Sequence, residues 1–352
     1  MLKSLTKKIQ SCTFFKLNYL SDDIAKPLFQ KKNNFKLSKF KMFNLYSFGK
    51  KNPKKIFYVI KRTPGAGLFS NVIYVLNHIL IARKHGFIPF VDFQNFNTIY
   101  NEKKKIGSYN SWEYYFKQLS NYKIKDIYNS KKVIITNNNF TFDNEYYHKI
   151  QNTNICDIAD DSLKIKKIYI KEAQNFSKKY FKGKILGIHY RGTSYKTSAN
   201  HPFPATKKQI IFACNKLMEK YKYDKIFLCT EDLSIFNTLV NEFKNKIICL
   251  KDSYRSYSDD AFKIYPRKKH RYRLGKEILV ESLLLSKCDG FLYASSNVSE
   301  FIKYLNFKKK KKYFKLNNGT NSANEYLAKW LWHLKNFFPK ILFGFDEKIK
   351  IQ

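Results

Sequence analysis

The chain has 352 residues, of which 44% are hydrophobic, and this is enough apolar material for packed cores, so the composition excludes a chain that is disordered throughout. Its 67 Lys and Arg residues outnumber 27 Asp and Glu residues, which gives a formal net charge of +40. A charge of this sign attracts anionic partners such as nucleic acid, phosphorylated substrates or acidic membrane surfaces. The lysines are spread along the whole chain, however, which favours a general compositional bias over a single binding patch.

The cysteines, histidines and apolar runs argue against several kinds of protein. The six cysteines form no C-x-x-C pair and the seven histidines no H-x-x-x-H pair, so no structural zinc site is expected. Cys229, Cys249 and Cys288 lie in or beside apolar runs, which predicts reduced, buried thiols in a cytoplasmic protein. No signal peptide is visible, and no run reaches the ~20 apolar residues of a membrane-spanning helix.

The first half of the chain predicts a basic, loosely ordered lead-in over residues 1–53 and an α/β domain over residues 54–180. Short apolar runs alternate there with segments whose apolar residues recur at helical spacing. Gly65-Ala-Gly67 precedes the longest of these helices, and Gly86 follows it in the position of a C-terminal cap. In chain order, the expected elements are a strand at 56–60, a helix at 68–85, a strand at 88–91, a short helix near 111–119, a strand at 133–135 and a helix at 162–180.

Strands and helices alternate more regularly over residues 181–320, and this predicts a parallel sheet with helices on its faces. The fold class is therefore α/β, and the basic run at 308–312 is interpreted as a solvated turn. In chain order, the expected elements are a strand at 185–189, a helix at 207–221, a strand at 225–230, a helix at 234–243, a strand at 247–250, a loop to 269, a helix at 274–286, a strand at 290–293 and a helix at 298–305.

A C-terminal helix and tail are expected over residues 321–352, with one strongly apolar helical face. Such a helix can lie on an acidic membrane surface, or it can pack back across the first domain, which is the favoured prediction. The face is predicted to carry Tyr326, Leu327, Trp330, Leu331, Leu334, Phe337 and Phe338, with Lys329 and Lys335 beside it.

The most informative stretch is 186–193, because it places His189 and Arg191 at the end of an expected buried strand. Residues two apart in an extended chain point to the same side, and open α/β sheets bind ligands at the edge where their strands end. Arg can hold a phosphate there through its planar fork of donors. In isolation, a structural Arg in a loop would explain the same residues.

Two further blocks follow later strands. Glu231 and Asp232 come directly after the strand at 225–230, and Ser295-Ser-Asn297 follows the strand at 290–293. The free N–H groups at the start of a helix bind phosphate, although a helix N-cap without any ligand explains these serines equally well. Glu281 stands out in an apolar helix, where it could accept hydrogen bonds from a guanine edge or pair with a nearby basic residue.

Together, these blocks resemble the α-1,6-fucosyltransferase and protein O-fucosyltransferase superfamily, most closely its bacterial members. The resemblance covers residues 55–338. It implies a two-domain GT-B architecture with two Rossmann-like domains, a GDP-fucose donor, and inverting transfer to a glycan acceptor without a metal or other cofactor, as in the synthesis of bacterial surface polysaccharide. The matching blocks are Gly65-Ala-Gly67 with Phe69-Ser-Asn71, Trp112-Glu113, His189-Tyr-Arg-Gly-Thr193, Thr230-Glu-Asp232 and Ala294-Ser-Ser-Asn297.

The resemblance also implies roles for individual residues in donor binding. His189 would contact the guanine side of the donor, Arg191 would bind its β-phosphate, and Glu281 would read the guanine. Ser295 and Ser296 would meet the diphosphate. The acidic pair of the family and other residues of the matching blocks complete the expected donor site, namely Glu231, Asp232, Gly192, Thr193, Asn297, Gly65, Gly67 and Asn71.

The residues leave the catalytic base open. Many relatives carry an acidic residue after the R-x-T block, whereas residues 194–200 contain no carboxylate, although Lys196 could offset charge on the leaving diphosphate. An inverting transfer needs a base that takes the proton of the acceptor hydroxyl. Asp92, Glu113 and His201 are candidates. Glu113 is slightly favoured because Trp112-Glu113 is one of the matching blocks, and an aromatic residue beside a carboxylate also suits sugar binding. A charge in the first turn of a helix explains Glu113 equally well.

Two other functions stay open at this point. A nucleic-acid-binding protein would explain the charge of +40 and the 17% aromatic residues, although these aromatics fall in periodic, core-like runs. A non-catalytic binder of sugar nucleotides would explain the missing carboxylate.

Overall fold

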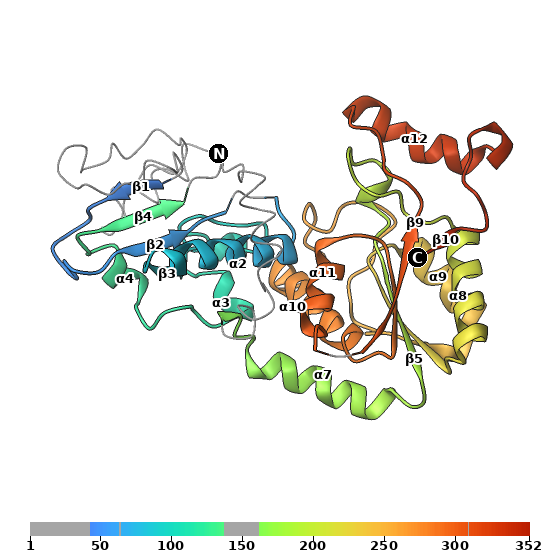
Figure 1. The fold of residues 1–352 in the computed structure, drawn as a ribbon, viewed down its shortest axis with the longest axis horizontal. Helices are drawn as coiled ribbons and strands as arrows, with labels where there is room; N and C mark the ends of the chain where they lie inside the picture. Colours follow the sequence, from blue (N-terminus) through green and yellow to red (C-terminus); the bar gives the residue numbers. More distant parts are fainter. Residues whose placement is uncertain (1–42, 63–64, 137–161, 309) are drawn as a thin grey trace. The chain divides into compact units, whose positions relative to one another are not determined.

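The computed structural model describes residues 43–62, 65–136, 162–308 and 310–352 of the chain. Its contacts divide the chain into two compact units, Met1–Lys166 and Lys167–Gln352. Each unit has helices packed on a sheet whose strands are mostly parallel (Figure 1). This confirms the predicted α/β fold class with parallel sheets. Most of the expected lead-in, as well as Cys12 and Cys156, lies outside the described residues.

The first unit is built on a four-stranded sheet in the order β1-β4-β2-β3. The central strand β2 (Phe57–Ile60) runs parallel to both β3 (Ile88–Val91) and β4 (Val133–Thr136). The edge strand β1 (Phe43–Tyr46) is antiparallel to β4. It falls within the stretch that the sequence assigned to the lead-in, because an edge strand is held by its partner rather than by a local signal.

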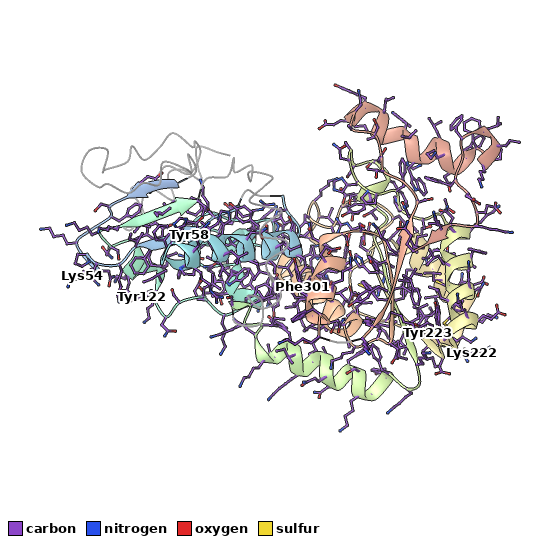
Figure 2. All side chains as sticks on the ribbon, viewed as in Figure 1. Lys54, Tyr58, Tyr122, Lys222, Tyr223 and Phe301 are labelled. Carbon is purple, nitrogen blue, oxygen red and sulfur yellow. The ribbon has the colours of Figure 1, made fainter. Side chains whose placement is uncertain are left out.

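The long helix of the first unit, α2 (Leu68–Lys84), follows the predicted bounds, and Gly86 has the positive φ of +66° that favours glycine there. Tyr58 lies in the interior of the unit (Figure 2), where its hydroxyl is 2.8 Å from His78 Nδ1 on α2. Burial and the charge of Arg62 lower the pKa of His78 to about 3.

The helix expected near 111–119 is shorter in the structure, where α3 spans only Trp112–Tyr115. Phe116 adopts an extended backbone and forms a bridge with Ile165, and the amide of Lys117 donates to the carbonyl of Lys164. This pairing with a distant segment ends the helix early. A second short helix, α4 (Ile124–Ile127), was not predicted.

The second unit has a six-stranded sheet in the order β10-β9-β8-β5-β6-β7. All neighbouring strands are parallel except the short edge strand β10. The chain passes from β5 outward on one side and later returns to the other side of β5, so β5 and β8 flank the point where the strand order reverses. The strands are β5 (Ile185–Tyr190), β6 (Lys225–Thr230), β7 (Ile247–Ile248), β8 (Gly290–Tyr293), β9 (Lys312–Asn317) and β10 (Lys350–Ile351).

Six helices of the second unit match the predicted segments, with ends that move by a few residues. α8 and α9 share a hydrophobic cluster with β5 and β6, and α10 packs against β5 on the side of Gly187, where an added Cβ would lie 3.0 Å from the side chain of Leu285. The helices are α7 (Lys167–Tyr180), α8 (Lys207–Tyr221), α9 (Leu233–Phe243), α10 (His270–Leu285), α11 (Asn297–Leu305) and α12 (Glu325–Phe337).

The largest differences in the second unit lie at the edges. The run at 308–312 is a turn only in part, because Lys312 opens β9 and Lys311 Nζ donates to the carbonyl of Leu285. Neither β9 nor β10 was predicted. Cys229 and Cys288 are buried free thiols as expected, whereas Cys249 is half-buried. In the described part of the chain, no helix is long and apolar enough to cross a membrane.

Candidate functional site

Three of the predicted blocks meet at one edge of the second unit's sheet. The parallel register pairs Tyr190 of β5 with Thr230 of β6, and His189 of β5 with Tyr293 of β8. The residues that follow these strands therefore leave the sheet at the same edge, beside the point where the strand order reverses. In parallel α/β sheets this edge is the usual place for a ligand.

The loop after β5 takes its shape from Glu231 and Asp232. The amide of Gly192 donates to Glu231 Oε1 at 3.2 Å, and the hydroxyl of Thr193 donates to the same oxygen at 3.3 Å. A Cβ on Gly192 would lie 2.5 Å from Asp232 Oδ2, so only glycine fits. The acidic pair after β6 thus positions the loop that carries Arg191.

Arg191 presents a positive charge at this edge. Its Nη2 donates to the hydroxyl of Ser194 at 3.2 Å, its guanidinium lies 5.2 Å from the centre of the Tyr195 ring, and its Nε is 3.9 Å from Glu231 Oε1. The side chain is 41% exposed, so an anion from solvent can reach it.

Tyr195 is a residue that the sequence analysis missed. Its ring lies 4.6 Å from the ring of His201, whose Nδ1 is 2.7 Å from the carbonyl of Ala199. Tyr195 therefore stands between Arg191 and His201. A single tyrosine in a loop matches no sequence motif, so the sequence did not indicate that Tyr195 contacts Arg191 and His201.

His189 lies almost completely buried beside Arg191. Burial, reinforced by the charge of Arg191, lowers the pKa of His189 to about 3. The imidazole is therefore neutral at neutral pH and can donate one hydrogen bond and accept another. His189 can therefore form hydrogen bonds to the polar edge of a ligand, but it is not suited to act as a general acid.

Lys196 forms an ion pair with Asp232, at 2.8 Å between Nζ and Oδ2. Asp232 is buried and also caps α9, because its Oδ1 accepts a hydrogen bond from the amide of Ile235 at 3.1 Å. Lys196 Nζ lies 5.1 Å from the ring centre of Trp332 on α12. In this structure the charge of Lys196 therefore balances Asp232.

Glu281 is buried on α10, and both of its oxygens accept hydrogen bonds from neutral groups. Cys229 Sγ donates at 2.8 Å and Ser253 Oγ donates at 2.7 Å. Burial raises the pKa of Glu281, and these hydrogen bonds together with the charge of Arg255 oppose the rise. The sequence left open an ion pair between Glu281 and a nearby basic residue. In the structure, Glu281 instead accepts hydrogen bonds from the thiol of Cys229 and the hydroxyl of Ser253.

The serine block after β8 forms the start of α11. Ser296 caps the helix, since its hydroxyl accepts from the amide of Ser299 at 3.2 Å while its own amide donates to Ser299 Oγ at 2.9 Å. Ser295 is half-buried and Asn297 is exposed. The N-cap interpretation accounts for the geometry of Ser296, and α11 begins where β8 ends, at the sheet edge that β5 and Arg191 share.

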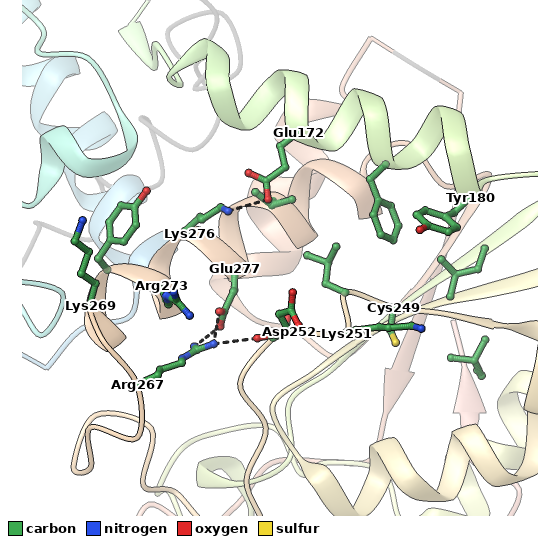
Figure 3. Close-up of a pocket in the computed structure, with 17 residues that line it drawn as sticks. Glu172, Tyr180, Cys249, Lys251, Asp252, Arg267, Lys269, Arg273, Lys276 and Glu277 are labelled. Atoms are coloured by element: carbon green, nitrogen blue, oxygen red, sulfur yellow. Dashed lines mark hydrogen bonds and ion pairs between the residues drawn. The ribbon is translucent and has the colours of Figure 1, made fainter.

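Two cavities of the second unit lie near residues of the predicted site. The first, of about 840 Å³, lies between α7, α10 and the residues after β7, and Ser253 lines it (Figure 3). Figure 3 shows Arg267 paired with Glu277 and donating to the carbonyl of Asp252. In the ion pair, Arg267 Nη1 lies 2.6 Å from Glu277 Oε1. Because Ser253 donates to Glu281, that carboxylate lies one side chain behind the cavity wall.

The second cavity, of about 890 Å³, lies beside the start of α8 and the tail of the chain. Tyr190, Lys196 and Trp332 are among the residues that line it. Neither cavity is lined by His189 or Arg191, which lie at the sheet edge itself.

The remaining candidates lie in the first unit. Glu113 is half-buried on α3 and accepts a hydrogen bond from Gln118 Nε2 at 3.2 Å. Its neighbour Trp112 is buried, packs against Phe116 with 4.4 Å between ring centres, and donates to the carbonyl of Lys117. Trp112 is therefore a core residue and offers no aromatic surface to a sugar, so the match of the Trp112-Glu113 block is the reason that still favours Glu113.

Asp92 serves the fold of the first unit. It is fully buried, and its oxygens accept from the amides of Gln94 and Asn95, from Asn95 Nδ2 and from the hydroxyl of Tyr128. Burial raises its pKa, and these hydrogen bonds oppose the rise. A carboxylate enclosed in this way has no room for an acceptor sugar.

The Gly-rich turn before α2 has the geometry that glycine allows. Gly65 has a φ of +109°, and Gly67 is the N-cap residue of α2. Asn71, buried in the first turn, donates to the carbonyl of Ala66 at 3.4 Å. Its Oδ1 has no hydrogen-bond partner among the described residues. Across those residues, no group of three or more His, Cys, Asp or Glu side chains could hold a metal ion.

No family model matches the chain, and no curated protein is similar to it. Its fold is similar to solved fucosyltransferases. NodZ from Bradyrhizobium is 14% identical, with a TM-score of 0.45 over 75% of this chain and 95% of that chain. POFUT1 in complex with GDP is 10% identical, with a TM-score of 0.44 over 74% of this chain and 98% of that chain.

A variant of FUT1 from Arabidopsis thaliana in complex with GDP is 10% identical, with a TM-score of 0.42 over 76% of this chain and 71% of that chain. At such identities the similarity concerns the fold alone.

Proposed function

We propose that the chain is a glycosyltransferase that takes its sugar, fucose, from a GDP-linked donor and transfers it to a glycan acceptor with inversion and without a metal ion. The observation that carries this proposal is the meeting of three blocks at one sheet edge. Arg191 after β5, Glu231 after β6 and Ser296 after β8 come together there although about a hundred residues separate the first from the last. A glycan of a bacterial cell surface is the proposed acceptor.

The diphosphate of the donor would bind between Arg191 and the start of α11. The guanidinium offers parallel donors to phosphate oxygens, and Ser194 and Tyr195 limit its rotation. The first amides of α11 add donors and the positive end of a helix dipole. Since the hydroxyl of Ser296 caps the helix, the backbone of this block would contact the phosphate.

The guanine would bind near His189 and Glu281. A guanine edge presents N–H donors, and Glu281 is a buried acceptor whose present donor, Ser253, lines the cavity of about 840 Å³. This volume lies within the ~300–1,000 Å³ usual for ligand pockets. Neutral His189 would supply one further hydrogen bond.

In the transfer, the acceptor oxygen forms a bond to the anomeric carbon of the sugar while the bond from that carbon to the phosphate oxygen breaks. GDP leaves with the electron pair, and Arg191 together with the start of α11 stabilises its charge. The proton of the acceptor hydroxyl passes to a base. Glu113 is the proposed base, and His201, which shares the Tyr195 contact with Arg191, is the alternative.

A thermal-shift comparison of GDP, UDP and CMP tests the donor assignment. At a hundredfold excess over its dissociation constant, a ligand stabilises the folded state by about 2.7 kcal/mol, so GDP should raise the melting temperature and UDP and CMP should not. Equal shifts with all three nucleotides would contradict guanine recognition. Release of GDP from GDP-fucose, with and without EDTA, then tests catalysis and metal independence. GDP binding without any turnover would instead indicate a non-catalytic binder.

A further inference from the structure

The C-terminal helix α12 is anchored to the second unit by one of its faces. Ala328 and Trp332 are buried, and the indole of Trp332 donates to the carbonyl of Pro204 at 2.9 Å. Trp332 also shares a small apolar cluster with Phe203 and Phe345. These contacts fix the orientation of the helix on the unit.

The opposite face of α12 is apolar as well, and it is exposed. At about 100° per residue, Tyr326, Trp330, Leu334 and Phe337 fall within one arc, away from the buried residues Ala328 and Trp332. The apolar series continues beyond the helix. The residues of this terminal apolar surface are Tyr326, Leu327, Trp330, Leu334, Phe337, Ile341, Leu342 and Phe343, with exposures between 46% and 91%.

The terminal apolar surface includes most of the apolar face that the sequence predicts for this helix. Leu331 and Phe338, which the sequence placed on that face, are half-buried, whereas the remaining members are exposed. Soluble proteins rarely leave a contiguous apolar patch of large side chains uncovered, and such patches mark binding surfaces. The terminal apolar surface therefore needs an occupant.

The charge of the chain and the side chains of the terminal apolar surface indicate which kind of partner covers this surface. A chain with a formal charge of +40 repels a second copy of itself and is attracted to an anionic surface. Lys329 on α12 borders the apolar residues, and its ammonium group can reach lipid headgroups while its stem lies along the apolar surface, whereas Lys340 just beyond the helix pairs with Asp346 at 2.6 Å. Trp, Tyr and Phe are the side chains that favour the boundary between lipid and water.

We propose that the terminal apolar surface docks on an anionic lipid bilayer, with α12 lying in the plane of the membrane boundary. A helix of Glu325–Phe337 that is held by Trp332 on one side cannot insert as a span, but its outer face can enter the boundary region. Lipid headgroups would neutralise Lys329. This inference is independent of the donor site.

Vesicle co-sedimentation of the full chain tests the proposal. The protein should sediment with vesicles of phosphatidylcholine mixed with phosphatidylglycerol, and much less with pure phosphatidylcholine. The double variant Trp330→Ser with Phe337→Ser should bind the anionic vesicles at least about tenfold more weakly, because two large apolar side chains no longer enter the lipid. Tyr257→Ser and Ile168→Ser, at comparably exposed positions in the same unit, are matched controls and should bind like the wild type.

Three results would overturn the proposal. These are no binding to anionic vesicles, equal binding by the double variant and the controls, and a dimer in sedimentation equilibrium that the double variant converts to a monomer. The last result would identify the surface as an interface between copies. All the substituted side chains are exposed, so the variants should keep the melting temperature and the GDP-induced shift of the wild type, and loss of either would show misfolding.

Discussion

Arg191 combines an exposed guanidinium with neighbours that orient it, Ser194 and Tyr195. The substitution Arg191→Lys keeps the charge but removes the planar fork. Since a hydrogen bond to a charged group contributes about 1.5–3 kcal/mol, GDP should bind roughly ten- to a hundredfold more weakly. Isothermal titration calorimetry measures this affinity.

The matched control for that experiment is Arg83→Lys in the first unit, where Arg83 donates to the hydroxyl of Ser162. It should leave GDP affinity unchanged. A wild-type affinity in the Arg191→Lys variant would sink the assignment of the diphosphate site.

The catalytic base is also assigned at the level of single residues. The two candidates are Glu113 in the first unit and His201 in the second unit. Glu113→Gln keeps the hydrogen bond to Gln118 possible but removes the charge. If Glu113 takes the acceptor proton, kcat should fall by about 10²–10⁴-fold while GDP still binds. Steady-state kinetics with GDP-fucose give both parameters.

The rival for this role is His201, which lies beside Tyr195 in the second unit. If His201 is the base, His201→Asn should show the severe loss of kcat and Glu113→Gln should be close to the wild type. Near-wild-type turnover in both variants would mean that neither residue is the base, and it would leave the donor site untouched.

At the scale of elements, the loop after β5 depends on one glycine. Gly192→Ala would bring a Cβ to 2.5 Å from both Asp232 Oδ2 and Tyr190 Cε1, so the loop must move. Such overpacking costs about 1–3 kcal/mol, and the displaced loop should also weaken GDP binding. Urea unfolding and calorimetry measure the two effects.

Gly67→Ala is the control for the effect of Gly192→Ala on the free energy of unfolding. It has an ordinary φ of −64° and nothing within 4 Å of an added Cβ, so its free energy of unfolding should stay near that of the wild type. If Gly192→Ala proved equally harmless, the close contact between the two loops would not be real.

For the whole molecule, two buried histidines predict how stability depends on pH. His78 and His189 each have a folded-state pKa of about 3, whereas an unfolded histidine has a pKa of about 6.5. Between these values the unfolded chain binds more protons, so the free energy of unfolding falls as the pH drops below ~6.5. Each histidine should contribute roughly 1 kcal/mol per pH unit.

Asp92 and Glu281 have raised pKa values, and their effect on the pH dependence of stability has the opposite sign. Each carboxyl stays protonated in the folded protein at pH values where it ionises in the unfolded chain, so the free energy of unfolding falls as the pH rises through this range. The informative quantity is therefore the difference between wild type and His189→Gln. Urea unfolding between pH ~5 and ~7 should give a shallower slope for the variant, by the contribution of one histidine. Identical slopes would show that His189 has the same pKa in the folded protein as in the unfolded chain.

The amino-acid sequence by itself determined the central elements and their order. The bounds of α8, β3, β6 and β8 follow the prediction, because apolar periodicity and caps such as Thr206 act within a few residues. The same patterns placed His189, Arg191 and Ser296 at the ends of strands. The edge to which they converge therefore follows from the parallel α/β class.

Only the tertiary structure decided what each side chain contacts. The edge strands β1, β9 and β10 exist through pairing with distant strands, and α3 ends where Phe116 pairs with Ile165. The partners of Glu281 and Lys196 come from other loops. Contacts between residues far apart in the chain leave no local periodic signal. For the same reason the sequence could show that α12 is apolar, whereas the fold determined which of its two apolar faces Trp332 anchors and which one stays at the surface.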